Sequence, residues 1–206
     1  MSLRKAAFAA MYDRCSRASE EAGLAAIRRR LLDDASGDVL ELGAGTGVNL
    51  SYYDASLSSL VLTEPEPAML RRLRPKALEQ APLAQVVQAS AEELPFEGSS
   101  FDTVVSTLVL CGVDDQGRVL AEVRRVLRPG GRLLFLEHVR SDDPQLARFQ
   151  DRINWLNHLL VDCDCNRQTL SAIEQQGFTV SRVDRLDLPK APKFTRPAIV
   201  GVAATP

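Results

Sequence analysis

Short apolar runs and longer segments with helical spacing alternate along the chain. Runs of strand length occupy residues 39–42, 60–63, 85–88, 101–108, 132–137, 178–184 and 198–204. The segments around them predict helices at 3–32, 48–53, 65–72, 115–127, 144–161 and 167–176. Gly23 is expected to break the first helical segment in two, and Gly177 is expected to cap the last one.

The order of these elements predicts the fold class. Strands that alternate with helices form a parallel sheet with helices on both faces. The segment 185–197 contains three prolines and has no helical spacing, so it lacks the crossover that a parallel return needs. We therefore expect an α/β, Rossmann-like fold with a seven-stranded, mostly parallel sheet whose last strand is antiparallel. The more polar run 85–88 is expected near the sheet edge.

Composition narrows the class of protein. The 206 residues are 45% hydrophobic and 25% charged, which is typical of one soluble globular domain. A net charge of −2 argues against a nucleic acid partner. The chain has two histidines and a C-x-C pair, Cys163 and Cys165, which do not match a zinc site. Few cysteines, no signal peptide and no apolar stretch of about 18 residues favour a cytoplasmic location.

A glycine-rich loop follows the first predicted strand. Gly43, Gly45 and Gly47 are spaced by two and precede a helical segment. Glycines there let a ligand approach the backbone N–H groups above the carboxyl end of a strand. Glu64 ends the next predicted strand, where an acidic side chain can accept hydrogen bonds from both ribose hydroxyls of an adenosine. The sequence therefore predicts a site for an adenosine-containing cofactor.

The spacing of the glycines separates the candidate cofactors. The dinucleotide pattern G-x-G-x-x-G/A requires a small residue at position 48 or 50, and Val48 and Leu50 stand there. A phosphate-binding P-loop requires Lys followed by Ser or Thr, and none follows. The segment 39–47 instead resembles the first motif of class I S-adenosylmethionine-dependent methyltransferases. Residues 91–96, 100–106 and 123–131 resemble later motifs of that class in order and spacing.

A narrower resemblance covers roughly residues 10–204. The stretches 107–113, 127–131, 137–139 and 155–167 resemble the methyltransferase-like protein seven family. Animal members of that family are membrane-associated thiol methyltransferases. The resemblance implies S-adenosylmethionine as the cofactor of a single methyltransferase domain, 1–206. Within it we expect a helical cap at 1–35, a cofactor-binding core at 36–140, and an acceptor-side helix with the C-terminal strands at 141–206.

The resemblance also implies a set of cofactor contacts. They are Tyr12, Glu41, Gly43, Ala44, Gly45, Asn49, Glu64, Pro65, Ser90, Ala91, Glu92, Thr107 and Leu108. In this pattern Gly43 and Gly45 pass beneath the methionine part of the cofactor, and Glu41 reaches its amino group. Tyr12 belongs to an N-terminal cap that closes over the cofactor. Ser90 departs from the pattern, because many relatives carry an Asp there that accepts a hydrogen bond from the adenine.

Catalytic side chains are expected beyond the fourth and fifth strands. The sulfonium of the cofactor is already electrophilic, so the protein has to align the acceptor and exclude water. His138 follows the fifth strand and is either the general base or a structural histidine. Further side chains line the acceptor pocket or belong to an ordinary loop or core: Cys111, Phe149, Ile153, Trp155, His158, Asp162 and Asp164. Arg28–Arg30 and Arg71, Arg72 and Arg74 are interpreted as solvated helix faces.

These observations predict a methyltransferase of a small, lipophilic acceptor, with a thiol favoured. A quinone-like ring carbon, a phenol or a lipid amine remains an alternative acceptor, and a non-catalytic cofactor-binding module is a further alternative. No metal and no nucleic acid partner is expected. Membrane association and the oligomeric state stay open.

Overall fold

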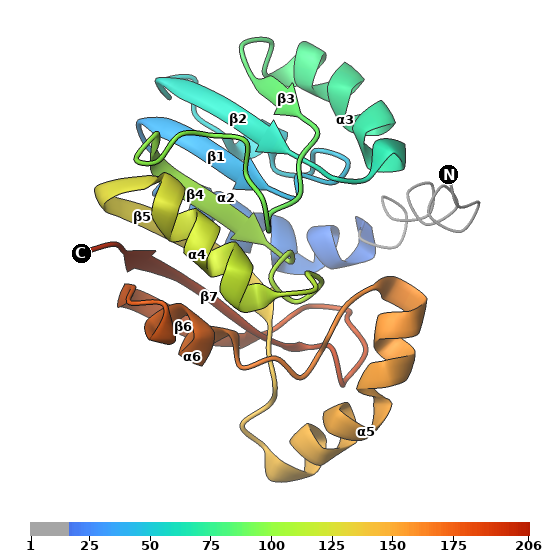
Figure 1. The fold of residues 1–206 in the computed structure, drawn as a ribbon. Helices are drawn as coiled ribbons and strands as arrows, with labels where there is room; N and C mark the ends of the chain where they lie inside the picture. Colours follow the sequence, from blue (N-terminus) through green and yellow to red (C-terminus); the bar gives the residue numbers. More distant parts are fainter. Residues whose placement is uncertain (1–16) are drawn as a thin grey trace.

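A computed structural model describes residues 17–206, so Tyr12 and the part of the predicted cap at 1–16 lie outside the described residues. The chain folds around one sheet with the strand order β3-β2-β1-β4-β5-β7-β6 (Figure 1). Its strands are β1 (Asp38–Leu42), β2 (Ser59–Thr63), β3 (Gln85–Val87), β4 (Phe101–Thr107), β5 (Leu127–His138), β6 (Thr179–Asp187) and β7 (Pro197–Ala204). The predicted α/β fold is confirmed, including the place of β3 at a sheet edge.

The sheet is parallel from β3 to β5 and antiparallel beyond it. β1 pairs in parallel with β2 and β4, and β5 pairs in parallel with β4. β7 is antiparallel to both β5 and β6 and lies between them, as the segment 185–197 predicted for the last strand. Consequently the carboxyl ends of β1, β2, β4 and β5 meet at one edge, where ligands bind in open sheets of this kind.

Helices cover both faces of the sheet (Figure 1). They are the π-turn η1 (Glu20–Leu24), α2 (Ala25–Leu32), the 3₁₀ turn η2 (Leu50–Tyr52), α3 (Pro67–Gln80), α4 (Gln116–Val126), α5 (Pro144–Val161) and α6 (Thr169–Gln175). Gly23 has φ 129° and kinks the chain between η1 and α2, and Gly177 has φ 83° just beyond α6. Both glycines therefore do what the sequence predicted. Among the described helices, none is long and apolar enough to cross a membrane.

Two predicted helices have the wrong extent. The helix expected at 48–53 is only the 3₁₀ turn η2. The helix expected at 65–72 begins at Pro67 and continues through Pro75 to Gln80. A proline inside a helix removes one backbone hydrogen bond, but Leu73 and Ala77 on either side of it are buried in the core. The burial of this apolar stripe outweighs the lost hydrogen bond.

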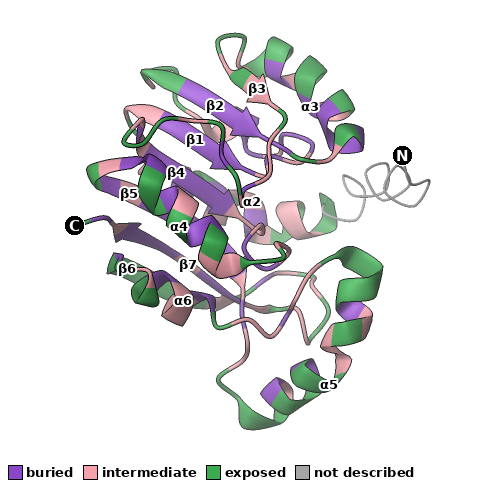
Figure 2. Cartoon of the chain, viewed as in Figure 1, coloured by how far each residue is buried: buried purple, intermediate pink, exposed green. Residues whose placement is uncertain are grey.

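The core consists of two layers, one on each face of the sheet. Leu133 and Phe135 of β5 pack toward α4 and α6, whereas Leu134 and Leu136 pack toward α2 and α3. Figure 2 shows the central strands as the most deeply buried part of the chain. A strand that buries both faces reads as a continuous apolar run, which explains why β5 was recognisable from the sequence.

Helix α5 lies beyond the carboxyl edge of the sheet, away from the main helical layers (Figure 1). Most of its side chains are at least partly exposed; Ala147, Gln150 and Asn157 are buried, and Gln150 has no exposed surface. Gln150 Nε2 donates to the carbonyl oxygens of Val139, Cys165 and Phe194 at 3.2, 2.7 and 2.9 Å. One buried amide therefore ties α5 to three loops at the carboxyl edge of the sheet.

Candidate active site

A cavity of about 570 Å³ opens at the carboxyl edge of the sheet. This volume lies within the range of about 300–1,000 Å³ that small-molecule sites have. Its walls come from the loops after β1, β2 and β4, the end of β5, the N-terminal helical segment, the end of α5 and the loop before β7. Lining residues named by the sequence prediction are Gly43, Gly45, Glu64, Leu108, Cys111, His138 and Asp162. The cavity therefore joins residues that are far apart in the chain.

The glycine loop forms the floor of this cavity at Gly43 and Gly45. Gly45 has φ 59°, a left-handed conformation that favours glycine. A β-carbon there would meet nothing closer than the Gly43 carbonyl oxygen at 3.9 Å, so the space above it is open to a ligand. Ala44 is buried, and its N–H donates to the Thr63 carbonyl oxygen at 2.8 Å. This bond fixes the loop against the end of β2.

Glu64 lies directly beside the glycine loop. Its Oε2 accepts a hydrogen bond from the Gly45 N–H at 2.9 Å, and its Oε1 accepts one from the Glu66 N–H at 2.8 Å. The side chain is buried, with 6% of the residue exposed, and it lines the cavity. Two backbone donors therefore hold the carboxylate at the cavity wall, where the sequence placed the acid and the glycines together.

Glu41 and Asn49 lie below the cavity floor and are not among its lining residues. Glu41 accepts hydrogen bonds from Asn49 Nδ2 at 2.9 Å and from the Tyr53 hydroxyl at 2.7 Å. Burial raises the pKa of Glu41, and the bonds from Tyr53 and Asn49 oppose that rise. Asn49 Nδ2 also donates to Thr107 Oγ1 at 2.9 Å. Through these hydrogen bonds Glu41 and Asn49 connect the ends of β1 and β4 next to the glycine loop.

Arg28 extends this buried network into the cavity. Its Nη1 donates to Thr107 Oγ1 at 2.9 Å and to Asn49 Oδ1 at 3.0 Å, and its Nε pairs with Glu20 at 3.0 Å. The residue is 3% exposed and lines the cavity, so its interpretation as part of a solvated face is wrong. The sequence contained a signal for this burial, because Arg28 stands four residues after Leu24 and therefore lies on the same, buried face of the helix.

Ser90, Ala91 and Glu92 lie after β3 and outside the lining of the cavity. The Ser90 hydroxyl donates to the Glu92 carboxylate, which also accepts a hydrogen bond from the Asp114 N–H at 3.1 Å. Burial raises the pKa of Glu92, but these hydrogen bonds outweigh it and the pKa is lowered. Ala91 is buried in the core. Pro65 follows Glu64, and its carbonyl oxygen accepts from Gln88 Nε2 at 3.2 Å.

His138 ends β5 and lines the cavity. Its Nδ1 is buried and has no hydrogen-bond partner among the described residues. Burial lowers the pKa of the imidazole, and a hydrogen bond to the Thr195 backbone partly opposes this. A neutral imidazole with an unpaired ring nitrogen at a cavity wall can accept a proton from a bound molecule.

The remaining predicted acceptor residues divide into two groups. Asp162 lines the cavity at the end of α5, together with Asn157 and Val161. Asp164 does not line it, because its carboxylate pairs with Arg167 at 2.6 Å and lies 3.3 Å from His158 Nδ1. The other predicted residues do not line the cavity: Trp155 is 67% exposed, Ile153 is half-buried, and Phe149 is 48% exposed with its ring edge-on to that of Phe194.

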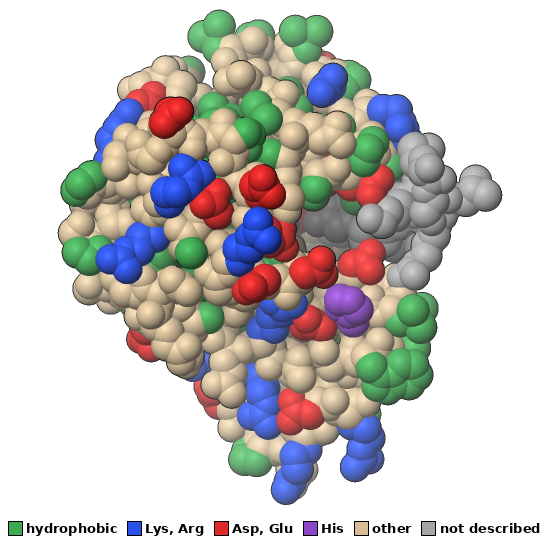
Figure 3. All heavy atoms as spheres, viewed as in Figure 1, with side chains coloured by type: hydrophobic (Ala, Val, Ile, Leu, Met, Phe, Trp, Pro, Cys, Tyr) green, Lys and Arg blue, Asp and Glu red, His purple; other side chains and the backbone are tan. Residues whose placement is uncertain are grey.

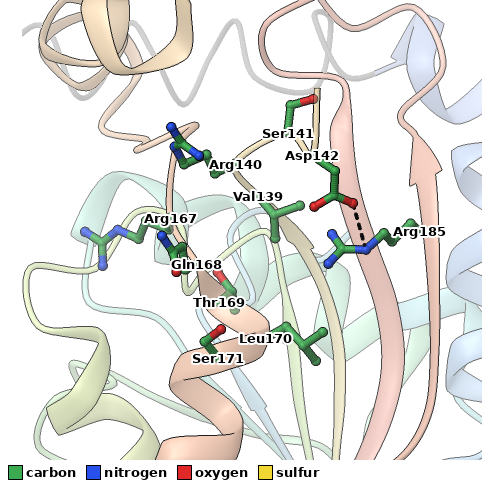
Figure 4. Close-up of a pocket in the computed structure, with 10 residues that line it drawn as sticks. All are labelled: Val139, Arg140, Ser141, Asp142, Arg167, Gln168, Thr169, Leu170, Ser171 and Arg185. Carbon is green, nitrogen blue, oxygen red and sulfur yellow. Dashed lines mark ion pairs between the residues drawn. The ribbon is translucent and has the colours of Figure 1, made fainter. Parts of the chain in front are cut away.

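A second hollow of about 350 Å³ lies on the other side of β5 (Figure 4). Three arginines line it, but each is paired with an aspartate: Arg185 with Asp142 at 3.1 Å, Arg140 with Asp151 at 2.8 Å, and Arg167 with Asp164. No residue of the glycine loop reaches it. Within residues 17–206 no group of three His, Cys, Asp or Glu side chains is arranged to hold a metal ion. The larger cavity is therefore the candidate active site.

Fold and cavity together define a class I S-adenosylmethionine-dependent methyltransferase. Residues 40–135 match the family model described as a methyltransferase domain. Solved structures agree on the fold: an S-adenosylmethionine-dependent methyltransferase from Thermotoga maritima superposes with a TM-score of 0.73 at 21% identity, and each chain is covered to 100%. A geranyl diphosphate methyltransferase in complex with S-adenosylmethionine gives a TM-score of 0.68 at 16% identity, over 90% of this chain and 86% of its own.

Sequence relatives give the family. Human thiol S-methyltransferase TMT1A is 34% identical over 80% of this chain and 69% of its own length. Human thiol S-methyltransferase TMT1B is 36% identical over 84% of this chain and 73% of its own length. A phosphatidylethanolamine N-methyltransferase of Cereibacter sphaeroides is 31% identical over 68% of this chain and 72% of its own. The chain belongs to the family of TMT1A and TMT1B, and it is an S-adenosylmethionine-dependent methyltransferase.

Proposed function

We propose that the protein methylates the thiol of a small, lipophilic acceptor. The observation that carries this proposal is the composition of the cavity on its acceptor side. Leu108, Val161, Leu188, Ala191 and Phe194 give that side an apolar lining, and His138 contributes an unpaired imidazole nitrogen. An apolar wall with few polar groups suits an acceptor whose bulk is hydrocarbon. The two human relatives that carry the name thiol S-methyltransferase support the same acceptor atom.

The apolar wall continues onto the outer surface through the end of α5. Val161 lines the cavity and is 42% exposed, and Leu159 and Leu160 beside it are 53% and 62% exposed. Figure 3 shows hydrophobic side chains gathered over this part of the molecule. Exposed apolar patches of this kind mark sites that meet other apolar molecules. A lipophilic acceptor would approach the cavity along this helix.

The cavity has a cofactor side at the glycine loop and an acceptor side at the end of α5, and each has a separate task in the proposed reaction. When bound, S-adenosylmethionine supplies a methyl group on a positively charged sulfur. Glu64, held by the Gly45 and Glu66 N–H groups, accepts hydrogen bonds from the ribose hydroxyls. The open space at Gly45 would admit the methionine part of the cofactor.

His138 handles the proton. A thiol has an ordinary pKa of about 8.5, so most of it is protonated at neutral pH, and the thiolate is the stronger nucleophile. Because burial lowers the pKa of His138, its imidazole is neutral at neutral pH and accepts the thiol proton at Nδ1. The apolar wall excludes water from the sulfur and favours direct, in-line transfer of the methyl group.

The test is a matched acceptor panel with isotopically labelled S-adenosylmethionine. Alkyl thiols, alkyl phenols and alkyl amines of the same chain length are compared, and label in the organic product is measured. We expect transfer to the thiols, with kcat/KM rising with chain length because the acceptor wall is apolar. Transfer to phenols or amines but never to thiols would refute the proposed acceptor.

A lipid amine is the second candidate, favoured by the acidic groups around the cavity. Glu20, Glu66 and Asp162 line it in addition to Glu64, so carboxylates outnumber the lining cations Arg28 and Lys190. An excess of negative charge attracts a cationic amine. The C. sphaeroides relative is named for a reaction on such an amine. The long-chain amine in the same panel decides between the two candidates, since it would outperform the thiol of equal length.

A further inference from the structure

Two thiols in the cavity wall have no task in the methyl transfer described above. Cys111 follows β4 and is 2% exposed, and Cys163 follows α5 and is half-buried. Both line the cavity, and both are free thiols. The Cys163 side chain is close enough to Cys111 to raise the pKa of its thiol. The wall of the acceptor side therefore contains a pair of adjacent thiols.

The backbone holds this pair together. The Asp164 N–H donates to the Cys111 carbonyl oxygen at 2.7 Å. A β-carbon on Gly112 would lie 2.7 Å from the Asp162 carbonyl oxygen, so only glycine permits the two segments to approach this closely. Segments 111–112 and 162–164 thus run side by side at the distance of a peptide hydrogen bond. Adjacent backbones of this kind bring two cysteines into the range of a disulfide.

The two thiols differ in access. Cys163 is the more exposed member, so a small molecule that enters the cavity meets it first. The neighbouring Cys163 side chain and burial raise the pKa of Cys111 well above its ordinary value, so Cys111 is not the thiol that attacks a peroxide first. One thiol is placed to react first and the other to react with the product, the arrangement of redox-active cysteine pairs.

We propose that Cys111 and Cys163 are a reversible modification site for hydroperoxides, and that their disulfide closes the acceptor side of the cavity. The Cys163 sulfur attacks the hydroperoxide, so that an S–O bond forms and the O–O bond breaks. The leaving oxygen departs with the thiol proton as an alcohol, or as water when the oxidant is hydrogen peroxide. The Cys111 sulfur then attacks the Cys163 sulfenic acid, forming the S–S bond and releasing water. Both sulfurs are oxidised, one peroxide is reduced, and a dithiol reverses the modification.

The disulfide changes the two halves of the cavity unequally. An S–S bond of about 2.05 Å is shorter than any contact between two thiols, so it draws the loop after α5 toward Cys111. Asn157, Val161 and Asp162 belong to the end of that helix and line the acceptor side. Gly45 and Glu64 belong to other loops and keep their mutual hydrogen bond. Oxidation therefore weakens acceptor binding and spares cofactor binding.

The first test maps the bond itself. The full chain, with S-adenosylhomocysteine bound, is treated with hydrogen peroxide, its remaining thiols are alkylated, and non-reduced peptides are analysed by mass spectrometry. We expect a cross-linked peptide joining Cys111 and Cys163, its loss in Cys163→Ser, and its persistence in the matched control Cys165→Ala. Cys165 is a neighbour of the pair, but its sulfur is bonded to Asn154 at 3.6 Å. Free thiols after peroxide, or a bond from Cys163 to another cysteine, would overturn the proposal.

The second test measures binding with a probe that cannot reduce the disulfide. A methyl alkyl thioether, the product of the proposed reaction, has no free thiol. We expect the thioether to bind more weakly by roughly tenfold or more after oxidation, because the changed shape of the pocket no longer fits it. Its affinity should return when dithiothreitol reduces the disulfide. S-adenosylhomocysteine should bind equally to both forms. Equal thioether affinity in the two forms would overturn the closure. If the thioether binds neither form, the proposed thiol function fails, and the peptide map still decides the disulfide.

Discussion

Replacement of Glu64 tests the cofactor half of the cavity most directly. Each of its oxygens accepts one backbone hydrogen bond, from Gly45 at 2.9 Å and from Glu66 at 2.8 Å. Glu64→Ala removes the carboxylate that we propose accepts the ribose hydroxyls, and it also leaves the Gly45 and Glu66 N–H groups without that acceptor. Loss of a hydrogen bond to a charged group corresponds to about 1.5–3 kcal/mol. The expected result is a roughly 10- to 150-fold weaker affinity for S-adenosylhomocysteine.

Glu64→Gln gives an internal check on that reasoning. A carboxamide has one acceptor oxygen, so it can satisfy only one of the two backbone donors, and its NH₂ group faces the other donor. The variant should therefore also bind the cofactor more weakly, although it is nearly isosteric. Isothermal titration with S-adenosylhomocysteine measures both variants, and Glu93→Gln, whose side chain is 85% exposed, is the matched control. Wild-type affinity in folded Glu64→Ala would refute the assignment of Glu64 to the ribose.

Three further changes follow from the same geometry. Arg28→Met leaves the Glu20 carboxylate buried without its partner, so urea unfolding should show a loss of about 3–5 kcal/mol; an unchanged midpoint would count against the network. Burial lowers the pKa of His138 below its ordinary 6.5. The unfolded chain therefore binds that proton more tightly, and stability falls as the pH drops through 6.5. His138→Asn should flatten this slope in thermal melts, and its thiol methylation should recover toward about pH 8.5, where the acceptor ionises. Gly47→Ala places a β-carbon 2.6 Å from Leu50 Cδ1 at φ 80°, so a loss of about 1–3 kcal/mol is expected; wild-type stability would show that the loop relaxes freely.

Features set by neighbours in the sequence could be predicted well. The antiparallel last strand followed from the prolines of 185–197, because a segment without a helix cannot make a parallel crossover. The meeting of Glu64 with the glycine loop followed from the rule that carboxyl ends of adjacent parallel strands share one edge. In both cases the decisive information lies within one or two consecutive elements.

Features set by distant packing were missed. Helix α3 continues through Pro75 only because Leu73 and Ala77 are buried against α2 and the sheet, and no local rule announces that gain. The approach of Cys163 to Cys111 depends on contact between the loops after α5 and β4, which the Asp164 N–H makes with the Cys111 carbonyl oxygen at 2.7 Å. Arg28 is the intermediate case, since its helical register placed it on the buried stripe while its charge suggested the surface.

The insertion of β7 between β5 and β6 sets an order of assembly for the molecule. β6 precedes β7 in the chain, yet within the sheet it is β7 to which β6 is hydrogen-bonded. The loop that carries Thr195 against His138 joins these two strands. During synthesis the glycine loop and Glu64 therefore emerge before β6, and β6 can pair with β7 only after β7 has been made. The loop between β6 and β7, which lines the acceptor side of the cavity, is therefore the last wall to be fixed in place.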